Sequence, residues 1–249
     1  MYSLNGRFKR ALVTGGAGFV GSHIVEELLA DGLEVVSVDD YSAGKAKNLQ
    51  PFKENVKLTE VNCDITDRSK LELFFDGVDI VFHEAVSKMT VCLKNPRRDL
   101  QINAEGTFNL LELSRDFGVK KFVHASTGSV YGEAKYYPTD EQHPVNPTSF
   151  YGVSKLAGEK YVRLFSEMFG IDTTILRYYH VYGPRQDYQG AYIAVIMKML
   201  DNIDKGIAPV IYGNGNEAFD FVSVKDCASA NICAMKSEIN NQFYNVGTG

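Results

Sequence analysis

A tyrosine and a lysine stand four residues apart, at Tyr151 and Lys155. On a helix, residues at this spacing share one face, so the phenol and the ammonium lie one turn apart. A phenol with a pKa of about 10 cannot take up a proton at neutral pH, but a nearby cation stabilises its charged form and lowers that pKa. The pair predicts an acid/base centre that acts on a hydroxyl group of a substrate.

Hydroxyl side chains precede this pair at Ser126, Thr127 and Ser129, directly after the apolar run Lys121–Ala125. The carboxyl end of a central strand faces the crevice in which open α/β sheets bind their ligands. A hydroxyl there can hydrogen-bond a reacting alcohol or ketone and help to pass the proton. A surface Tyr–Lys pair on an amphipathic helix would explain the first motif equally well if it stood alone, and the hydroxyl run favours catalysis.

Residues 15–21, which read GGAGFVG, follow the apolar run Ala11–Thr14 and open the amphipathic run Phe19–Ala30. A strand that turns sharply into a helix brings backbone amides to a pyrophosphate, and glycines let the phosphate approach. Asp39 ends the next apolar run, Val35–Val38, where a carboxylate can bind a ribose 2′-hydroxyl. The pattern predicts a dinucleotide site.

Asp39 and Asp40 favour NAD over NADP, because carboxylates repel a 2′-phosphate and no arginine is expected nearby to receive one. Asp64 and Ile65 follow the third apolar run and are expected near the adenine. A helix N-cap is the alternative role for that segment.

Short apolar runs alternate with longer amphipathic runs, which is typical of a parallel sheet with crossover helices. We expect strands at Ala11–Thr14, Val35–Val38, Val56–Val61, Ile80–His83, Lys121–Ala125 and Thr173–Arg177, and helices at Phe19–Ala30, Ser69–Phe75, Asp99–Phe117 and Tyr151–Phe169. After about Gly183 we expect helices at Gly190–Asn202 and Val224–Met235 and short strands at Pro209–Tyr212 and Phe219–Val222. The predicted fold is α/β: a Rossmann-like, doubly wound parallel sheet over residues 1–182, followed by a small, apparently truncated substrate lobe over residues 183–249, parts of which return to the sheet.

The formal net charge of −5, without a basic block, argues against nucleic acid as a partner. The sequence has neither an apolar run long enough for a membrane span nor an apolar signal segment among its first ten residues. Its four cysteines form no C-x-x-C pair, which is typical of reduced thiols in a cytoplasmic protein. No carboxylate or cysteine is spaced to complete a metal site around His83, His124 and His180, so no metal is expected.

Three segments together resemble the extended short-chain dehydrogenases/reductases, the NAD-dependent nucleotide-sugar epimerase/dehydratase family. They are residues 14–23 (TGGAGFVGSH), the trio Thr127, Tyr151 and Lys155, and residues 176–184 (LRYYHVYGP). The likeness runs from Arg10 to Gly249. It implies that Tyr151 is the acid/base, that Thr127 is the assisting hydroxyl and that Lys155 binds the nicotinamide ribose of NAD.

The resemblance also implies a wider site. The expected cofactor-binding residues are Gly15, Gly18, Phe19, Val20, Gly21, Asp39, Asp40, Asp64, Ile65, Ala85, Lys88, Asn103, Tyr151, Lys155 and Tyr178. The expected substrate residues are Lys88, Ser126, Ser129 and His180. Lys88 is explained equally well as a solvated loop charge, and Asn103 matches the family's buried helix asparagine.

A homodimer is implied as well, in which Asp99–Phe117 and Tyr151–Phe169 pair with their copies in a four-helix bundle. Both helices carry apolar residues beyond the one stripe that a sheet-packed helix needs, among them Leu110, Leu111, Leu113, Val162, Leu164 and Phe165.

Gly128 and Ser129 stand where the dehydratases of this family carry Asp-Glu and the decarboxylases carry Glu. Elimination of water needs a further acid and base, which these two residues cannot supply. The resemblance therefore favours C4 epimerisation of a nucleotide-activated sugar, with a UDP-sugar favoured, through a transient keto-sugar. A nucleotide-sugar dehydratase or reductase is the alternative within the family. A non-catalytic NAD-binding regulator is an alternative of another class, against which the intact trio argues.

Two positions depart from the family pattern. His180 stands where an asparagine contacts the substrate, and Phe219 stands where an arginine meets the diphosphate, a role that a phenyl ring cannot fill. Residues 243–249 resemble a strand and turn after which family members continue. We therefore expect this chain to bind NAD well and a nucleotide sugar poorly, as a shortened chain or a short form with another substrate would.

Overall fold

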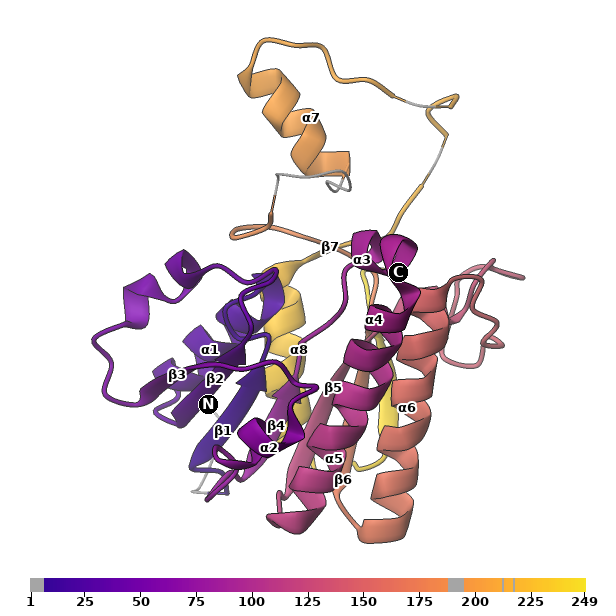
Figure 1. The fold of residues 1–249 in the computed structure, drawn as a ribbon. Coiled ribbons are helices and arrows are strands. Elements are labelled where there is room, and N and C mark those ends of the chain that lie inside the picture. Colours follow the sequence, from indigo (N-terminus) through magenta and orange to yellow (C-terminus); the bar gives the residue numbers. More distant parts are fainter. Residues whose placement is uncertain (1–6, 188–194, 212, 217) are drawn as a thin grey trace.

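The computed structural model describes residues 7–187, 195–211, 213–216 and 218–249. Its main sheet has seven parallel strands in the order β3-β2-β1-β4-β5-β6-β9 (Figure 1). The strands are β1 (Arg10–Thr14), β2 (Glu34–Asp39), β3 (Leu58–Asn62), β4 (Ile80–His83), β5 (Lys121–Thr127), β6 (Asp172–Tyr178) and β9 (Gln242–Val246). The predicted doubly wound parallel sheet is confirmed.

The central strands are covered on both faces, which explains why their sequences lack an alternating pattern. All four residues of β4 are buried, as are residues 121–126 of β5. At the edge, β3 buries only Val61. The strand expected to begin at Val56 begins at Leu58 instead, and Val56 is almost fully exposed in the preceding turn.

Helices cover both faces of the sheet (Figure 1). On one face α1 packs against α8, and on the other lie α2, α5 and α6. The helices are α1 (Phe19–Ala30), α2 (Arg68–Glu72), α3 (Met89–Lys94), α4 (Pro96–Leu100), α5 (Thr107–Asp116), α6 (Phe150–Phe169), α7 (Val195–Asp204) and α8 (Val224–Lys236), with single turns at Ala46–Asn48, Gln50–Phe52 and Gly128–Val130. In the described part of the chain, none of the helices combines the length and the apolar character needed to cross a bilayer.

The continuous helix expected over residues 99–117 is wrong in detail. Its stretch begins with α4, continues through a wider π-helical segment, Gln101–Gly106, and ends as α5. A Cβ atom on Gly106 would lie 2.5 Å from Cδ1 of Ile65, so the backbone packs where a side chain would not fit. Such wide turns recur near functional sites, and this one borders the cavity described below.

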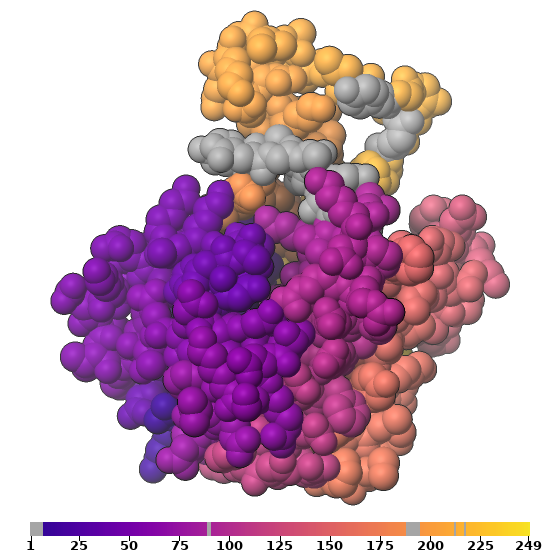
Figure 2. Space-filling view, viewed as in Figure 1, coloured from indigo at the N-terminus to yellow at the C-terminus, as the bar shows by residue number. Residues whose placement is uncertain are grey.

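Two elements of the C-terminal region, β9 and α8, belong to the main sheet and its helix layer. β9 pairs with β6, and α8 packs on α1, while β7 (His180–Tyr182) and β8 (Phe221–Ser223) form a small parallel ladder. The strand expected at Pro209–Tyr212 is wrong over residues 209–211, which are irregular, and Tyr212 lies outside the described residues. Of the helix expected at Gly190–Asn202, residues 190–194 also lie outside, and the remainder is α7. In Figure 2, α7 and the loop after it stand clear of the body.

Candidate active site

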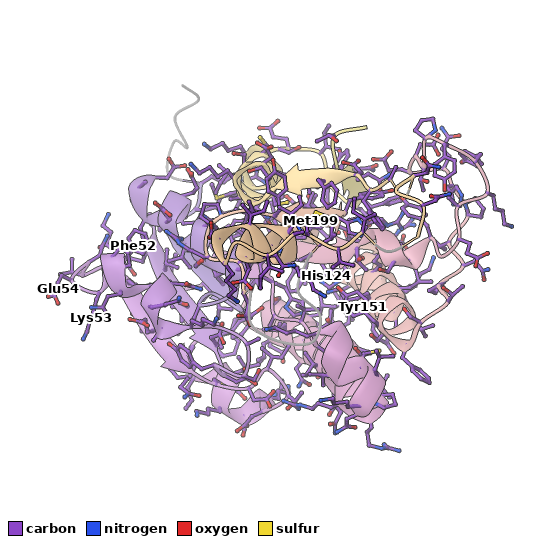
Figure 3. All side chains as sticks on the ribbon, turned by 90° about the horizontal axis from the view of Figure 1, so that it is seen from above. Phe52, Lys53, Glu54, His124, Tyr151 and Met199 are labelled. Carbon is purple, nitrogen blue, oxygen red and sulfur yellow. The ribbon has the colours of Figure 1, made fainter. Side chains whose placement is uncertain are left out.

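A cavity of about 940 Å³ opens at the carboxyl ends of β1, β2, β4, β5 and β6. All of the expected cofactor-binding residues except Asn103 line it, and so do three expected substrate residues, Lys88, Ser126 and His180. Val195 and Ile196, at the start of α7, also line it. In the view from above (Figure 3), α7, which carries Met199, is seen in front of the sheet.

The glycine turn packs the backbone too tightly for side chains at two positions. Gly15 has a left-handed backbone with φ of 66°, and a Cβ atom there would come within 2.8 Å of the Ala85 nitrogen. A Cβ atom on Gly21 would overlap the carbonyl oxygen of Gly15. No side chain caps the start of α1, and its first turn lines the cavity. This arrangement suits the binding of a pyrophosphate by backbone amides.

Asp39 connects the glycine turn to the next loop. Its buried carboxylate accepts hydrogen bonds from the backbone nitrogens of Ala17 at 3.0 Å and Tyr41 at 2.8 Å, and it also lines the cavity. Burial raises the pKa of Asp39, and the two amide hydrogen bonds oppose that shift. Asp39 is therefore fixed by the fold in the lining of the cavity.

The expectation that no arginine lies near the acidic cluster is wrong. Arg98, from α4, hydrogen-bonds the carboxylate of Asp64 and lies 4.0 Å from that of Asp40. It also donates to the hydroxyl of Thr66 at 3.3 Å. Because Arg98 is engaged by Asp64 and does not line the cavity, the preference for NAD continues to rest on Asp39.

Tyr151 and Lys155 project from the first turns of α6, which begins where the Ser149 hydroxyl accepts a hydrogen bond from the Gly152 nitrogen at 3.0 Å. Burial raises the pKa of Tyr151 to about 12, and a hydrogen bond with Thr127 opposes this shift. The direction is opposite to that expected from the Tyr–Lys spacing, because within the protein desolvation outweighs the favourable interactions.

Lys155 is almost completely buried, and burial lowers its pKa to about 8. Three carboxylates oppose this shift, Glu84 most strongly, followed by Glu159 and Asp99. The ammonium is thus held in a cavity where its charge depends on neighbouring anions.

The three hydroxyl residues at the end of β5 and just after it, Ser126, Thr127 and Ser129, lie in different places relative to the cavity. Ser126 lines the cavity and donates a hydrogen bond to Oε1 of Glu159 at 2.5 Å. Thr127 lies behind the cavity lining, beside the Tyr151 phenol, and its hydroxyl oxygen accepts from the Ser129 nitrogen at 3.1 Å. Ser129 does not line the cavity.

Asn103 lies outside the cavity lining and is fully buried. Its carbonyl oxygen accepts from the backbone nitrogen of Ser87 at 2.9 Å, and its amide donates to Asp99 and to Ser154, each at 3.0 Å. These bonds connect the loop after β4 to α4 and α6, so Asn103 orients elements of the site.

An aromatic wall stands on the substrate side of the cavity. The ring centroids of His180 and Phe219 are 4.5 Å apart, and Phe221 lies 5.8 Å from His180 and 6.0 Å from Phe219. Nearby, Asp187 accepts from the ammonium of Lys88 at 3.3 Å. The position of the family's arginine is therefore part of an apolar surface.

Sequence reasoning did not predict the buried ionic groups Glu84, Glu159 and Arg177. A carboxylate directly after the apolar strand β4 was a usable signal for Glu84, and the spacing of four residues from Lys155 was one for Glu159. No group of three or more potential ligands for a metal ion occurs among the residues that the structure describes.

Comparisons with known proteins agree with this geometry. The model of the NAD dependent epimerase/dehydratase family matches residues 11–247. The chain is 43% identical over 241 residues to a putative UDP-glucose 4-epimerase of Methanocaldococcus jannaschii, which covers 96% of this chain and 76% of that protein.

Two solved structures are similar over comparable shares of the chain. A UDP-N-acetylglucosamine 4-epimerase from Methanobrevibacter ruminantium, in complex with UDP-N-acetylmuramic acid, has a TM-score of 0.92 and 37% identity, over 97% of this chain and 77% of that one. A UDP-glucose 4-epimerase from Thermus thermophilus in complex with NAD has a TM-score of 0.86 and 38% identity, over 96% of this chain and 78% of that one.

Proposed function

We propose that this chain, which belongs to the NAD-dependent epimerase/dehydratase family, is an NAD-dependent enzyme that inverts C4 of a UDP-activated sugar through a transient keto-sugar. The observation that carries the proposal is one cavity lined by the glycine turn, Tyr151 and Lys155. The related epimerases in complex with NAD and with a UDP-sugar support the choice of cofactor and substrate class.

Within this proposal, Tyr151 takes the proton of the C4 hydroxyl and later returns it to the keto oxygen. The phenol keeps its proton at neutral pH unless further positive charge enters the cavity, because burial raises its pKa to about 12. NAD, when bound, supplies the hydride acceptor and the positive charge of the nicotinamide ring. Lys155 adds a second positive charge, and Thr127 hydrogen-bonds the phenol.

Binding of the dinucleotide is assigned to the turn and the strand ends. The amides at the start of α1 hold the pyrophosphate, and Asp39 accepts from a ribose hydroxyl. Ser126 and His180 face the sugar, as residues that line the same cavity.

A reaction that needs only one acid/base suits the turn after β5. A Cβ atom on Gly128 would press on the ring of Tyr179 at 3.2 Å, so a larger residue has little room there. Ser129 is engaged with Thr127 through its nitrogen and its hydroxyl. Neither position supplies the additional acid and base that loss of water from the sugar would need.

A homodimer is part of the proposal, built on the outer faces of α4, α5 and α6. Of the apolar residues expected at the interface, only Leu164 is exposed, whereas Leu110, Leu111, Leu113, Val162 and Phe165 are buried in the core. Other large apolar side chains are exposed on these helices, namely Leu100, Phe108, Phe150, Val153, Tyr161, Met168 and Phe169. Leu164→Glu is expected to produce a monomer in analytical ultracentrifugation, and an unchanged dimer would contradict this interface.

The proposal includes a cytoplasmic location. All four cysteines are free, and three of them are buried, as is usual for proteins of a reducing compartment.

The function is tested by incubating the protein with NAD and a panel of UDP-, dTDP- and GDP-sugars and following C4 by NMR. Inversion of a UDP-sugar without net formation of NADH is the expected result. Release of water would identify a dehydratase instead, and net oxidation of NADH, added in place of NAD in a parallel reaction, would identify a reductase. Binding of NAD with no reaction on any sugar would support the non-catalytic alternative.

A further inference from the structure

We propose that Glu84 is a positioning residue of the acid/base centre, whose buried carboxylate is held by Tyr178 and keeps the ammonium of Lys155 charged. The inference rests on the proposed function only in taking Lys155 as part of that centre. It concerns a residue that neither the glycine turn nor the catalytic trio includes.

Glu84 is fixed from three directions. Its nitrogen donates to the Thr14 carbonyl at 3.1 Å, which anchors the end of β4 to β1. The Tyr178 hydroxyl donates to Oε1 of Glu84 at 3.0 Å, and the Asn231 amide donates to that hydroxyl oxygen at 2.6 Å. A second hydrogen of the same amide reaches the Cys227 carbonyl at 2.9 Å, so α8 orients the series.

The direction of these hydrogen bonds matters. Asn231 donates to Tyr178, and Tyr178 donates to Glu84, so the series ends on an acceptor. Donors that converge on a carboxyl group stabilise its ionised form. The network therefore favours a negative charge on a side chain that is only 9% exposed.

The other two carboxylates near Lys155 accept hydrogen bonds from other side chains. Glu159 forms a bidentate ion pair with Arg177, at 2.9 and 2.6 Å, so its charge is largely neutralised. Asp99 accepts from Asn103 at 3.0 Å and has no cation within salt-bridge distance in the described part of the chain. Glu84 likewise lacks an ion pair there, and it opposes the desolvation of Lys155 more strongly than the other two.

The remaining titratable groups around Lys155 add no negative charge at neutral pH. His83 on β4 and His124 on β5 are fully buried, and burial holds the pKa of each well below its usual value, so both are neutral. Tyr151 on α6 and Tyr178 on β6 have raised pKa values and keep their protons. Only the three carboxylates remain to balance Lys155.

The charges of Glu84 and Lys155 stabilise each other. Burial raises the pKa of Glu84 to about 7, while Tyr178 and the charge of Lys155 oppose that shift. Burial lowers the pKa of Lys155 to about 8. Each charge supports the other across the cavity, so loss of the Glu84 charge must lower the pKa of Lys155 further.

The test measures Lys155 directly in the cofactor-free protein, so it does not depend on epimerase activity. In protein labelled with ¹³C at the lysine Cε, the Lys155 signal, assigned with Lys155→Met, is titrated by NMR. Glu84→Gln is expected to move its midpoint down by about one pH unit, the lower end of the effect of a neighbouring charge. Glu84→Asp, which keeps the charge, should restore much of the midpoint.

Two further variants make the test decisive. Glu72→Gln removes an exposed carboxylate from α2 and should leave the Lys155 midpoint unchanged. Tyr178→Phe removes the donor to Glu84 and should lower the Lys155 midpoint by less than Glu84→Gln does. This second variant keeps the proposal testable if the Glu84→Gln protein does not fold. An unchanged Lys155 midpoint in a folded Glu84→Gln or Tyr178→Phe protein would overturn the proposal.

Discussion

Replacing Glu159 by glutamine breaks a buried ionic network that connects the catalytic helix to the sheet. The Glu159 carboxylate accepts two hydrogen bonds from Arg177 and one from Ser126, and Arg177 also donates to the Tyr131 hydroxyl at 2.8 Å. The side chains of the ion pair are only 5% and 4% exposed. Glutamine keeps the shape but leaves the guanidinium without its anion.

The magnitude follows from what remains buried. Removing one partner of a buried ion pair typically costs about 3–5 kcal/mol, because the other charge stays desolvated. Replacing both partners by apolar residues is often nearly neutral. Here the Tyr131 hydroxyl keeps its hydrogen bond to Asn245 at 2.7 Å, and Ser126 reaches the cavity, so Glu159→Leu with Arg177→Met leaves few groups unsatisfied.

The assay is urea unfolding followed by far-UV circular dichroism for Glu159→Leu, Arg177→Met and the double variant, with Glu159→Gln measured beside them. We expect each single change to lower the free energy of unfolding by about 3–5 kcal/mol and the double change to cost less than either. Single losses below about 1 kcal/mol, or losses that add within the usual 0.5 kcal/mol or so, would refute the reasoning.

Four other changes test the site. Tyr151→Phe should lower turnover by about 10²–10⁴-fold while calorimetry finds NAD binding retained, and near-normal turnover would exclude the phenol as the base. Asp39→Ala should weaken NAD binding by roughly 1–3 kcal/mol and lower the melting temperature, because two backbone amides lose their acceptor. Equal affinity of the unchanged protein for NAD and NADP would contradict the role of Asp39 in selecting NAD. His83 and His124 bind fewer protons in the folded than in the unfolded state, so the free energy of unfolding should fall as the pH drops below about 6.5. The expected slope is about 1.4 kcal/mol per pH unit for each histidine, and His124→Phe should reduce that slope in urea unfolding measured at several pH values. Phe219→Arg should lower the Kd for a UDP-sugar about tenfold, the effect of one hydrogen bond to a charged group, and an unchanged Kd would show that the diphosphate is bound elsewhere.

The features predicted well from the sequence depend on short stretches of chain. The apolar runs around β1, β4 and β5 define buried strands. The glycines of residues 15–21 indicate a tight turn in which the backbone packs closely on neighbouring backbone. Because parallel strands all end at one edge of the sheet, these local motifs are sufficient to predict a common cavity.

The features that were missed depend on which distant segments meet. Arg98 reaches Asp64 across 34 positions of sequence, which no local pattern around Asp64 indicates. The sequence predicted a strand within residues 243–249 and a return of this region to the sheet. It did not predict that β9 pairs with β6, because residues 179–241 lie between the two strands.

The direction of the Tyr151 pKa shift shows the same limit within the catalytic motif itself. Spacing along α6 correctly indicates that Lys155 shares a helix face with the phenol, and it predicts a lowered pKa. Desolvation, however, depends on everything packed around the pair, and it raises the pKa of Tyr151 while lowering that of Lys155. An acid/base centre of this kind therefore depends on charges brought in by other elements. Of the three carboxylates that oppose the desolvation of Lys155, Glu84 at the end of β4 is the one that lines the same cavity.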